Sequence, residues 1–211
     1  MKNNFISKVF QWLALGLVVT FGLGYAITLS EDVVITVVNS LGIIAILELV
    51  AGFCLSLLIN KISDTMAKIL YLLYAALTGV TFSTIFLSFE MSSIIYVFLA
   101  TAIIFGLFGF IGKKIKMDLS GFGTFLLISL LGMIILEIVN LFILNQALDM
   151  TVSLVTVLIF VGYIVFDINR IIKLEVMNPD EKYAVFGAFQ LYLDIINIII
   201  RLLRLFGKNR D

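Results

Sequence analysis

Seven long apolar segments constrain the fold of this chain more than any other feature. They cover residues 10–29, 33–59, 69–89, 93–111, 122–144, 152–172 and 184–206. Each is about as long as the roughly 20 residues that an α-helix needs to cross a bilayer. Hydrophobic residues make up 62% of the 211 residues, more than the interior of a soluble domain of this size can hold. The sequence therefore predicts an all-α, polytopic membrane protein, with one seven-helix domain over residues 1–211.

The last apolar segment carries a stripe of polar residues on one helix face. At spacings of four, three, four and three positions, the stripe consists of Gln190, Asp194, Asn197, Arg201 and Arg204. A charge that faces lipid at mid-membrane costs from ~3 to more than ~10 kcal/mol. The stripe must therefore face other helices or water, and we expect the last helix to lie at the centre of the bundle. Such a stripe is either a packed polar seam or a path for ions or protons.

Basic residues fall on alternate connections between the segments. The ten are Lys2, Lys8, Lys61, Lys68, Lys113, Lys114, Lys116, Arg170, Lys173 and Lys182. The other connections hold Glu31, Asp32, Glu90 and Asp149 and no basic residue. The positive-inside rule then places the N-terminus in the cytoplasm.

Basic residues near the C-terminus conflict with this orientation. Seven spans place the tail outside, yet Lys208 and Arg210 follow Arg201 and Arg204 there. Either ten basic residues outweigh four, or the last segment is re-entrant and returns to the cytoplasm. We favour seven full spans, because the last segment is long enough to cross.

Two aspartates on consecutive predicted helices are candidates for a pH sensor. Asp167 lies near the cytosolic end of the sixth segment, and Asp194 lies about ten residues into the seventh. If the two carboxyl groups meet in a poorly solvated place, both cannot readily be ionised and they share one proton. Carboxylate oxygens are also the hard ligands that calcium prefers, so the pair is a candidate metal site. The alternative has Asp167 solvated at the membrane interface and Asp194 paired with a cation.

Other polar residues within the segments suggest further roles. Glu137 and Arg201 lie at similar depths in the outer half, which predicts a structural ion pair. Glu48 has no evident partner at its depth and is a candidate for lining a pore, as are Gln190 and Asn197 on the polar stripe.

Several classes of function are disfavoured by what the chain lacks. It contains no histidine and one cysteine, which excludes a His-based zinc site, a serine–histidine nucleophile and an intramolecular disulfide. An intramembrane aspartyl protease would place glycine directly before a catalytic acid, whereas Phe166 and Leu193 precede Asp167 and Asp194. The formal net charge of zero gives no basic footprint for nucleic acid. We therefore expect no enzyme and no nucleic-acid partner.

Three glycines in the fourth segment recur at every third position. They are Gly106, Gly109 and Gly112. Small residues allow membrane helices to approach closely, so this spacing predicts tight helix packing rather than a ligand site.

Four stretches resemble the Bax inhibitor-1 family, also called the transmembrane BAX inhibitor motif family. They are IGKKIKMDLSGFGTFL at 111–126, VNLF at 139–142, VFDINRI at 165–171 and LYLDIINIIIRLLRLFG at 191–207. Their order and spacing resemble the family across most of the chain. The resemblance implies seven helices with the last one central, in agreement with the polar stripe.

The resemblance also implies a prokaryotic, pH-sensitive calcium leak channel. Asp167 and Asp194 match the family's pH-sensing pair, and Lys61 matches a basic latch near it, where relatives can have arginine. Phe166 replaces the tyrosine that more often precedes the first aspartate. The implied partners are calcium as the permeant ion and the lipid bilayer, with no cofactor. The expected location is a prokaryotic plasma membrane, and a monomer is favoured.

An alternative role follows from the same resemblance. Some bacterial members of the family bind and restrain a membrane-embedded ATP-dependent protease, and some of these lack the two aspartates. The alternative function is thus a regulator of a membrane protease or of cell death that acts through protein contacts. Retention of both aspartates favours the channel.

Overall fold

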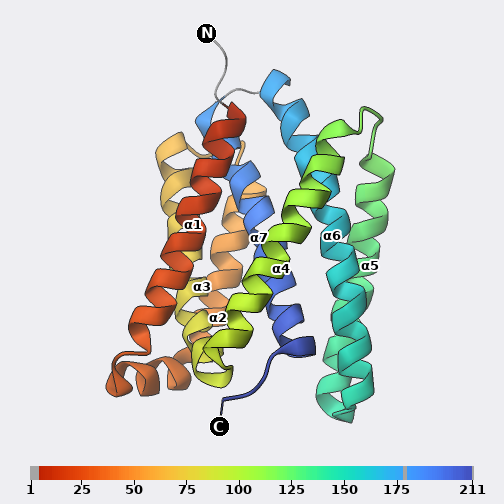
Figure 1. Ribbon diagram of the computed structural model, residues 1–211. Helices are drawn as coiled ribbons and strands as arrows, with labels where there is room; N and C mark the ends of the chain where they lie inside the picture. The colour runs from red at the N-terminus through yellow and green to blue at the C-terminus, as the bar shows by residue number, and fades with distance from the viewer. Residues whose placement is uncertain (1–4, 178–179, 211) are drawn as a thin grey trace. The chain divides into compact units, whose positions relative to one another are not determined.

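The computed structural model describes residues 5–177 and 180–210 of the chain, and this part folds into seven α-helices joined by short turns (Figure 1). The helices are α1 (Phe5–Ile27), α2 (Glu31–Leu58), α3 (Asp64–Ser88), α4 (Met91–Lys114), α5 (Ser120–Ile143), α6 (Gln146–Met177) and α7 (Glu181–Phe206). All seven are long and apolar enough to cross a membrane. The prediction of an all-α, seven-span membrane protein is confirmed. Of the basic residues, Lys2 lies outside the described part.

Polar residues set several helix ends beyond the apolar segments. The Ser63 side chain accepts a hydrogen bond from the Met66 amide at 3.3 Å and caps α3. Asn145 does the same for α6 through the Leu148 amide at 3.0 Å. Leu144, with a φ of 55°, ends α5 in the left-handed conformation that commonly closes a helix. Because α6 is 32 residues long, it extends past its apolar segment at both ends.

The helices form two compact units. Unit 1 comprises residues 1–90, 173–192 and 209–211, and unit 2 comprises residues 91–172 and 193–208. Helix α7 contributes its first half to unit 1 and its second half to unit 2. In its most apolar 18-residue stretch, 72% of the residues are buried, against 6% for α5. The prediction that other helices enclose α7 is therefore confirmed, whereas the single domain 1–211 stays a prediction.

Small residues bring α1 and α3 together in unit 1. A Cβ atom on Gly24 would lie 2.8 Å from the Gly79 carbonyl oxygen, and one on Gly79 would lie 2.8 Å from the Thr20 carbonyl oxygen. The two backbones are thus in direct contact, as is common where membrane helices cross at glycine. The Thr20 hydroxyl donates to the Ala75 carbonyl at 2.8 Å and lies 2.5 Å from the Tyr192 hydroxyl, which fixes the first half of α7 against this pair.

One glycine of the fourth segment makes the close contact in unit 2. A Cβ atom on Gly112 would lie 2.6 Å from the Val165 carbonyl oxygen of α6. The prediction of tight packing is therefore right for Gly112. It is wrong for Gly106, where a Cβ atom would meet nothing within 4 Å, and Gly109 allows only an ordinary contact at 3.8 Å.

The C-terminal tail shows that α7 crosses completely. The Arg210 amide donates to the Ser88 carbonyl at the end of α3 at 2.9 Å. The Lys208 amide donates to the Ser93 hydroxyl in the first turn of α4 at 3.1 Å. Both acceptors flank the α3–α4 connection, which is one of the connections without basic residues. The re-entrant alternative for the last segment is therefore wrong, and α7 is one continuous helix.

Candidate functional site

Asp167 and Asp194 form the core of the candidate site in unit 2. Their exposed fractions are 4% and 3%, so both carboxyl groups are buried. They lie close enough to interact electrostatically, and Tyr163, one turn before Asp167 on α6, lies within range of both. Arg170, at the end of the same stretch, also acts on Asp167. The alternative that Asp167 is solvated is wrong, because its side chain is buried among the helices.

The turn of α6 that carries Asp167 is fixed by α4, α5 and the loop between them. Val165 lies against Gly112 of α4, and Phe166 lies against Gly123 of α5. The Asn169 side-chain amide donates to the Ile115 carbonyl in the connecting loop at 2.5 Å. These three contacts surround Asp167 in sequence. They hold its backbone in place, which is what a precisely oriented carboxyl group requires.

Glu48 lies on α2 in unit 1 and has partners that the sequence did not indicate. The Thr78 hydroxyl of α3 donates to its Oε1 atom at 2.6 Å, and the Thr81 hydroxyl lies 3.4 Å from Oε2. The expectation that Glu48 has no partner at its depth is wrong. The partners are hydroxyl groups rather than cations. A role for Glu48 in lining a pore stays a prediction.

Lys61 is exposed in the turn after α2, also in unit 1. This turn is held to the start of α7 by two contacts. The Lys182 ammonium donates to the Ile62 carbonyl at 3.3 Å, and the Tyr183 hydroxyl lies 3.0 Å from the Asn60 side-chain oxygen. The action of Lys61 as a latch on the aspartate pair of unit 2 stays a prediction.

The two polar candidates on α7 belong to different units. Gln190 lies in unit 1 and Asn197 in unit 2, and both are half-buried. The Asn197 side-chain amide donates to the Leu193 carbonyl of its own helix at 2.8 Å. Its oxygen therefore stays available to other partners. The assignment of either residue to a pore lining stays a prediction.

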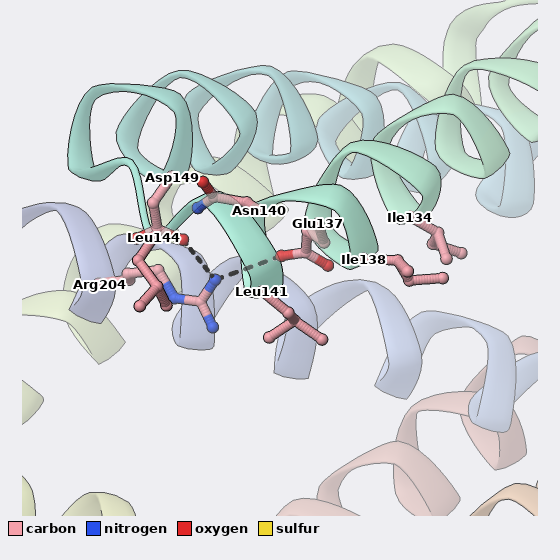
Figure 2. Close-up of a pocket in the computed structure, with 8 residues that line it drawn as sticks. All are labelled: Ile134, Glu137, Ile138, Asn140, Leu141, Leu144, Asp149 and Arg204. Atoms are coloured by element: carbon pink, nitrogen blue, oxygen red, sulfur yellow. Dashed lines mark hydrogen bonds and ion pairs between the residues drawn. The ribbon is translucent and has the colours of Figure 1, made fainter.

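Charged residues gather near the C-terminal end of α7. Arg201 binds Glu137 of α5 with two guanidinium nitrogens on two carboxylate oxygens, the pairing that their depths predicted; the Nη2–Oε2 distance is 2.8 Å. Figure 2 shows Arg204 between Glu137 and Asp149, with its Nη1 atom 3.2 Å from Glu137 Oε1 and 3.1 Å from Asp149 Oδ1. We call Glu137, Asp149, Arg201 and Arg204 the charged cluster. It borders a pocket of about 500 Å³ with apolar walls from α5.

The link between Asp149 and Arg204 was missed in the sequence. Asp149 lies in the first turn of α6 and Arg204 in the last turn of α7. Opposite charges at matching ends of two antiparallel neighbours are a signal that could have identified the pair.

Comparison with known proteins identifies the family. A profile described as "Inhibitor of apoptosis-promoting Bax1" matches residues 2–211. The chain belongs to this Bax inhibitor family. The inner membrane protein YbhL of Escherichia coli K12 is 34% identical over 217 residues, which cover 99% of this chain and 93% of YbhL. An uncharacterized protein of Borreliella burgdorferi is 35% identical over 219 residues, covering 100% of this chain and 94% of that protein.

Two Bax inhibitor motifs of the chain pack against each other around Asp167. The stretch 111–126 supplies Gly112 and Gly123, and the stretch 165–171 supplies Val165 and Phe166. The resemblance that the motifs indicated is thus confirmed at the family level. In the fold, these two motifs pack together at the turn of α6 that carries Asp167.

We expect Gly123→Leu to destabilise unit 2 and Gly121→Leu to leave it almost unchanged. A Cβ atom on Gly123 would lie 2.5 Å from the Phe166 ring, whereas one on Gly121 would meet nothing within 4 Å. Overpacking of this kind costs about 1–3 kcal/mol. Thermal unfolding of the purified variants in detergent tests this. Equal midpoints for both variants would show that the Gly123–Phe166 contact is not tight.

Proposed function

We propose that this protein is a calcium leak channel of the membrane, gated by a proton that Asp167 and Asp194 share. One observation carries the proposal: two buried carboxyl groups from adjacent helices interact inside a membrane-spanning unit. Intramembrane acids are costly and ordinarily serve ion or proton transfer. The proposal gives the two aspartates no catalytic role and needs no cofactor.

The chemistry of the pair suits passage of calcium rather than its retention. Two carboxylates supply about four oxygens, whereas calcium takes 6–8. Water and backbone carbonyls must provide the rest, and a site with only two charged ligands binds calcium more weakly than a site with more carboxylates. When both groups are ionised, their repulsion favours separation or recruitment of a cation. Lys61 and calcium are the proposed counter-charges, and Glu48, Gln190 and Asn197 are the proposed lining residues.

Calcium flux into proteoliposomes tests the proposal. The purified protein is reconstituted around a fluorescent calcium indicator, and the initial rate is measured from pH 5 to 8. We expect a rate above that of protein-free liposomes and a dependence on pH. A rate equal to that of protein-free liposomes at every pH would overturn the proposal.

The proposed orientation has a cytoplasmic N-terminus and an external C-terminus. Cys54 is the single cysteine, so a Cys54→Ser variant allows labelling at chosen positions. We expect a membrane-impermeant maleimide added to intact cells to label Lys208→Cys and not Lys113→Cys. Labelling of Lys113→Cys alone would reverse the orientation.

The second candidate is a regulator that acts through contacts with a membrane protease or a cell-death protein. The family description, which names apoptosis, supports the cell-death partner. Co-purification of a membrane protease from native membranes, together with absence of calcium flux, would favour this candidate over the channel.

A further inference from the structure

Two polar helix faces oppose each other in unit 2. The face on α6 carries Asp149, Ser153, Thr156, Tyr163 and Asp167, at spacings of four, three, seven and four positions, and the buried Phe160 occupies the same face between Thr156 and Tyr163. The face on α7 consists of Asp194, Asn197, Arg201 and Arg204, at spacings of three, four and three positions. Both helices run antiparallel as consecutive spans.

Contacts at both ends join the two faces. At one end, Arg204 Nη1 lies 3.1 Å from Asp149 Oδ1. At the other end, Asp194 and Asp167 interact electrostatically. Because both junctions use the same faces, the residues between them line one seam. From Asp194 to Arg204 the helical rise gives a seam about 15 Å long.

Four buried polar atoms on this seam lack a hydrogen-bond partner among the described residues. They are Ser153 Oγ, Thr156 Oγ1, Asp194 Oδ2 and Arg201 Nε. Ser153 and Thr156 are 0% and 1% exposed. Buried polar groups that find no protein partner ordinarily bind ordered water.

Other hydroxyls in unit 2 behave differently. Thr101 donates to the Val97 carbonyl, and Thr151 to the Ala147 carbonyl, each at 2.8 Å. Such bonds to the preceding turn are available to every helical threonine and serine. Ser153 and Thr156 do not make them in this structure. Their hydroxyls are therefore not satisfied by their own helix and remain available to water.

The charged cluster stands at one end of the seam. The exposed fraction of the side chain rises from 12% for Arg201 to 29% for Glu137 and 41% for Arg204. The bidentate pair of Arg201 and Glu137 thus lies between the buried part of the seam and the more exposed Arg204. A guanidinium group at this place opposes the entry of cations.

We infer that the seam between α6 and the second half of α7 holds a file of water molecules that leads from Asp167 and Asp194 to the surface at the C-terminal end of α7, closed by the Arg201–Glu137 ion pair. The inference rests on the proposed function, for which it supplies a route and a barrier on one side of the aspartate pair. Hydration of the seam is measurable without any ion flux, so the two proposals can fail separately.

Cysteine accessibility tests the water file and its barrier. Ser153→Cys and Thr156→Cys are made in a Cys54→Ala background, with Leu154→Cys as the control because Leu154 is 53% exposed on the outer surface of α6. The protein in liposomes is treated with a membrane-impermeant, cationic thiosulfonate, which reacts with a thiol that water reaches. Counter-labelling with a fluorescent maleimide gives the rate. Each cysteine is tested with the parent pair and with Glu137→Gln/Arg201→Gln.

We expect slow reaction at positions 153 and 156 with the parent pair and roughly tenfold faster reaction without it. The Leu154→Cys control is expected not to react in either background. If the double glutamine variant does not give a monodisperse protein, Arg201→Lys replaces it. Lysine keeps the charge but cannot bind bidentately, so we expect an intermediate acceleration.

Two results would overturn the inference. Absence of reaction at both positions in every folded background would show that no water enters the seam. Equal rates with and without the ion pair would show that the pair is not the barrier. Accelerated reaction together with absence of calcium flux would support the seam and reject the channel.

Discussion

Replacing Glu137 with leucine is expected to lower the free energy of unfolding by about 3–5 kcal/mol, because it leaves a buried guanidinium without its partner. The Arg201 side chain is 12% exposed, and Glu137 is its partner in the ion pair. Arg201→Leu is expected to cost less, since Arg204 also binds Glu137. The double variant Glu137→Leu/Arg201→Leu is expected to be more stable than Glu137→Leu alone. Unfolding of the purified variants in mixed micelles with increasing denaturing detergent measures all three.

Arg204→Leu provides the control for this series. Its side chain is 41% exposed, its partner Glu137 keeps Arg201, and its partner Asp149 is 35% exposed, so we expect a loss of about 1 kcal/mol or less. Equal, small losses from all four variants would show that the pair contributes little to stability. The order of the stability losses of Glu137→Leu, Arg201→Leu and the double variant is more informative than any single value. This order depends on which variant leaves a charged side chain without a partner.

Asp167→Asn and Asp194→Asn are each expected to flatten the pH dependence of calcium flux. Each change removes one of two buried carboxyl groups that interact, so no proton remains to be shared. The double variant is therefore expected to add little to either single change. Initial flux rates in proteoliposomes between pH 5 and 8 test this for the parent, both single variants and the double variant.

A matched control uses a carboxylate away from the pair. Asp32 is exposed in the first turn of α2, and Asp32→Asn is expected to retain the parent profile. If Asp167→Asn and Asp194→Asn also retained it, the pair would not be the sensor. Glu48 would then be the next residue to test. It is an acid within the span α2, and the Thr78 hydroxyl donates a hydrogen bond to it.

Apolar length predicted the seven helices well, and polar ends limited the accuracy of their bounds. The start of α6 at Gln146 and its end at Met177 lie outside the apolar segment 152–172. The first of these turns is stabilised by Asn145, which caps the start of α6.

Partners of the candidate residues were predicted where they were opposite charges at equal depth, as for Glu137 and Arg201. They were missed where they were hydroxyl groups, as for Glu48 with Thr78. Depth along a helix can be counted in the sequence, but the rotation of one helix against another depends on their contacts. A Cβ atom on Gly123 would meet the Phe166 ring of α6, whereas one on Gly121 would meet nothing within 4 Å, although the two are close in sequence. The spacing of the two glycines in the sequence does not indicate which of them faces α6.

The division of α7 between two units has a consequence for biosynthesis. Helices enter the membrane in the order of synthesis, so α1–α3 and α4–α6 arrive before either unit has its fourth segment. During that interval Glu137 lies in the membrane before Arg201 and Arg204 have been made, which is a costly position for a carboxylate. Both units are therefore completed only by the same 26-residue helix α7. If translation stops before residue 181, both units of the released chain are incomplete. Cellular quality control would then degrade the whole chain, because neither unit can fold fully.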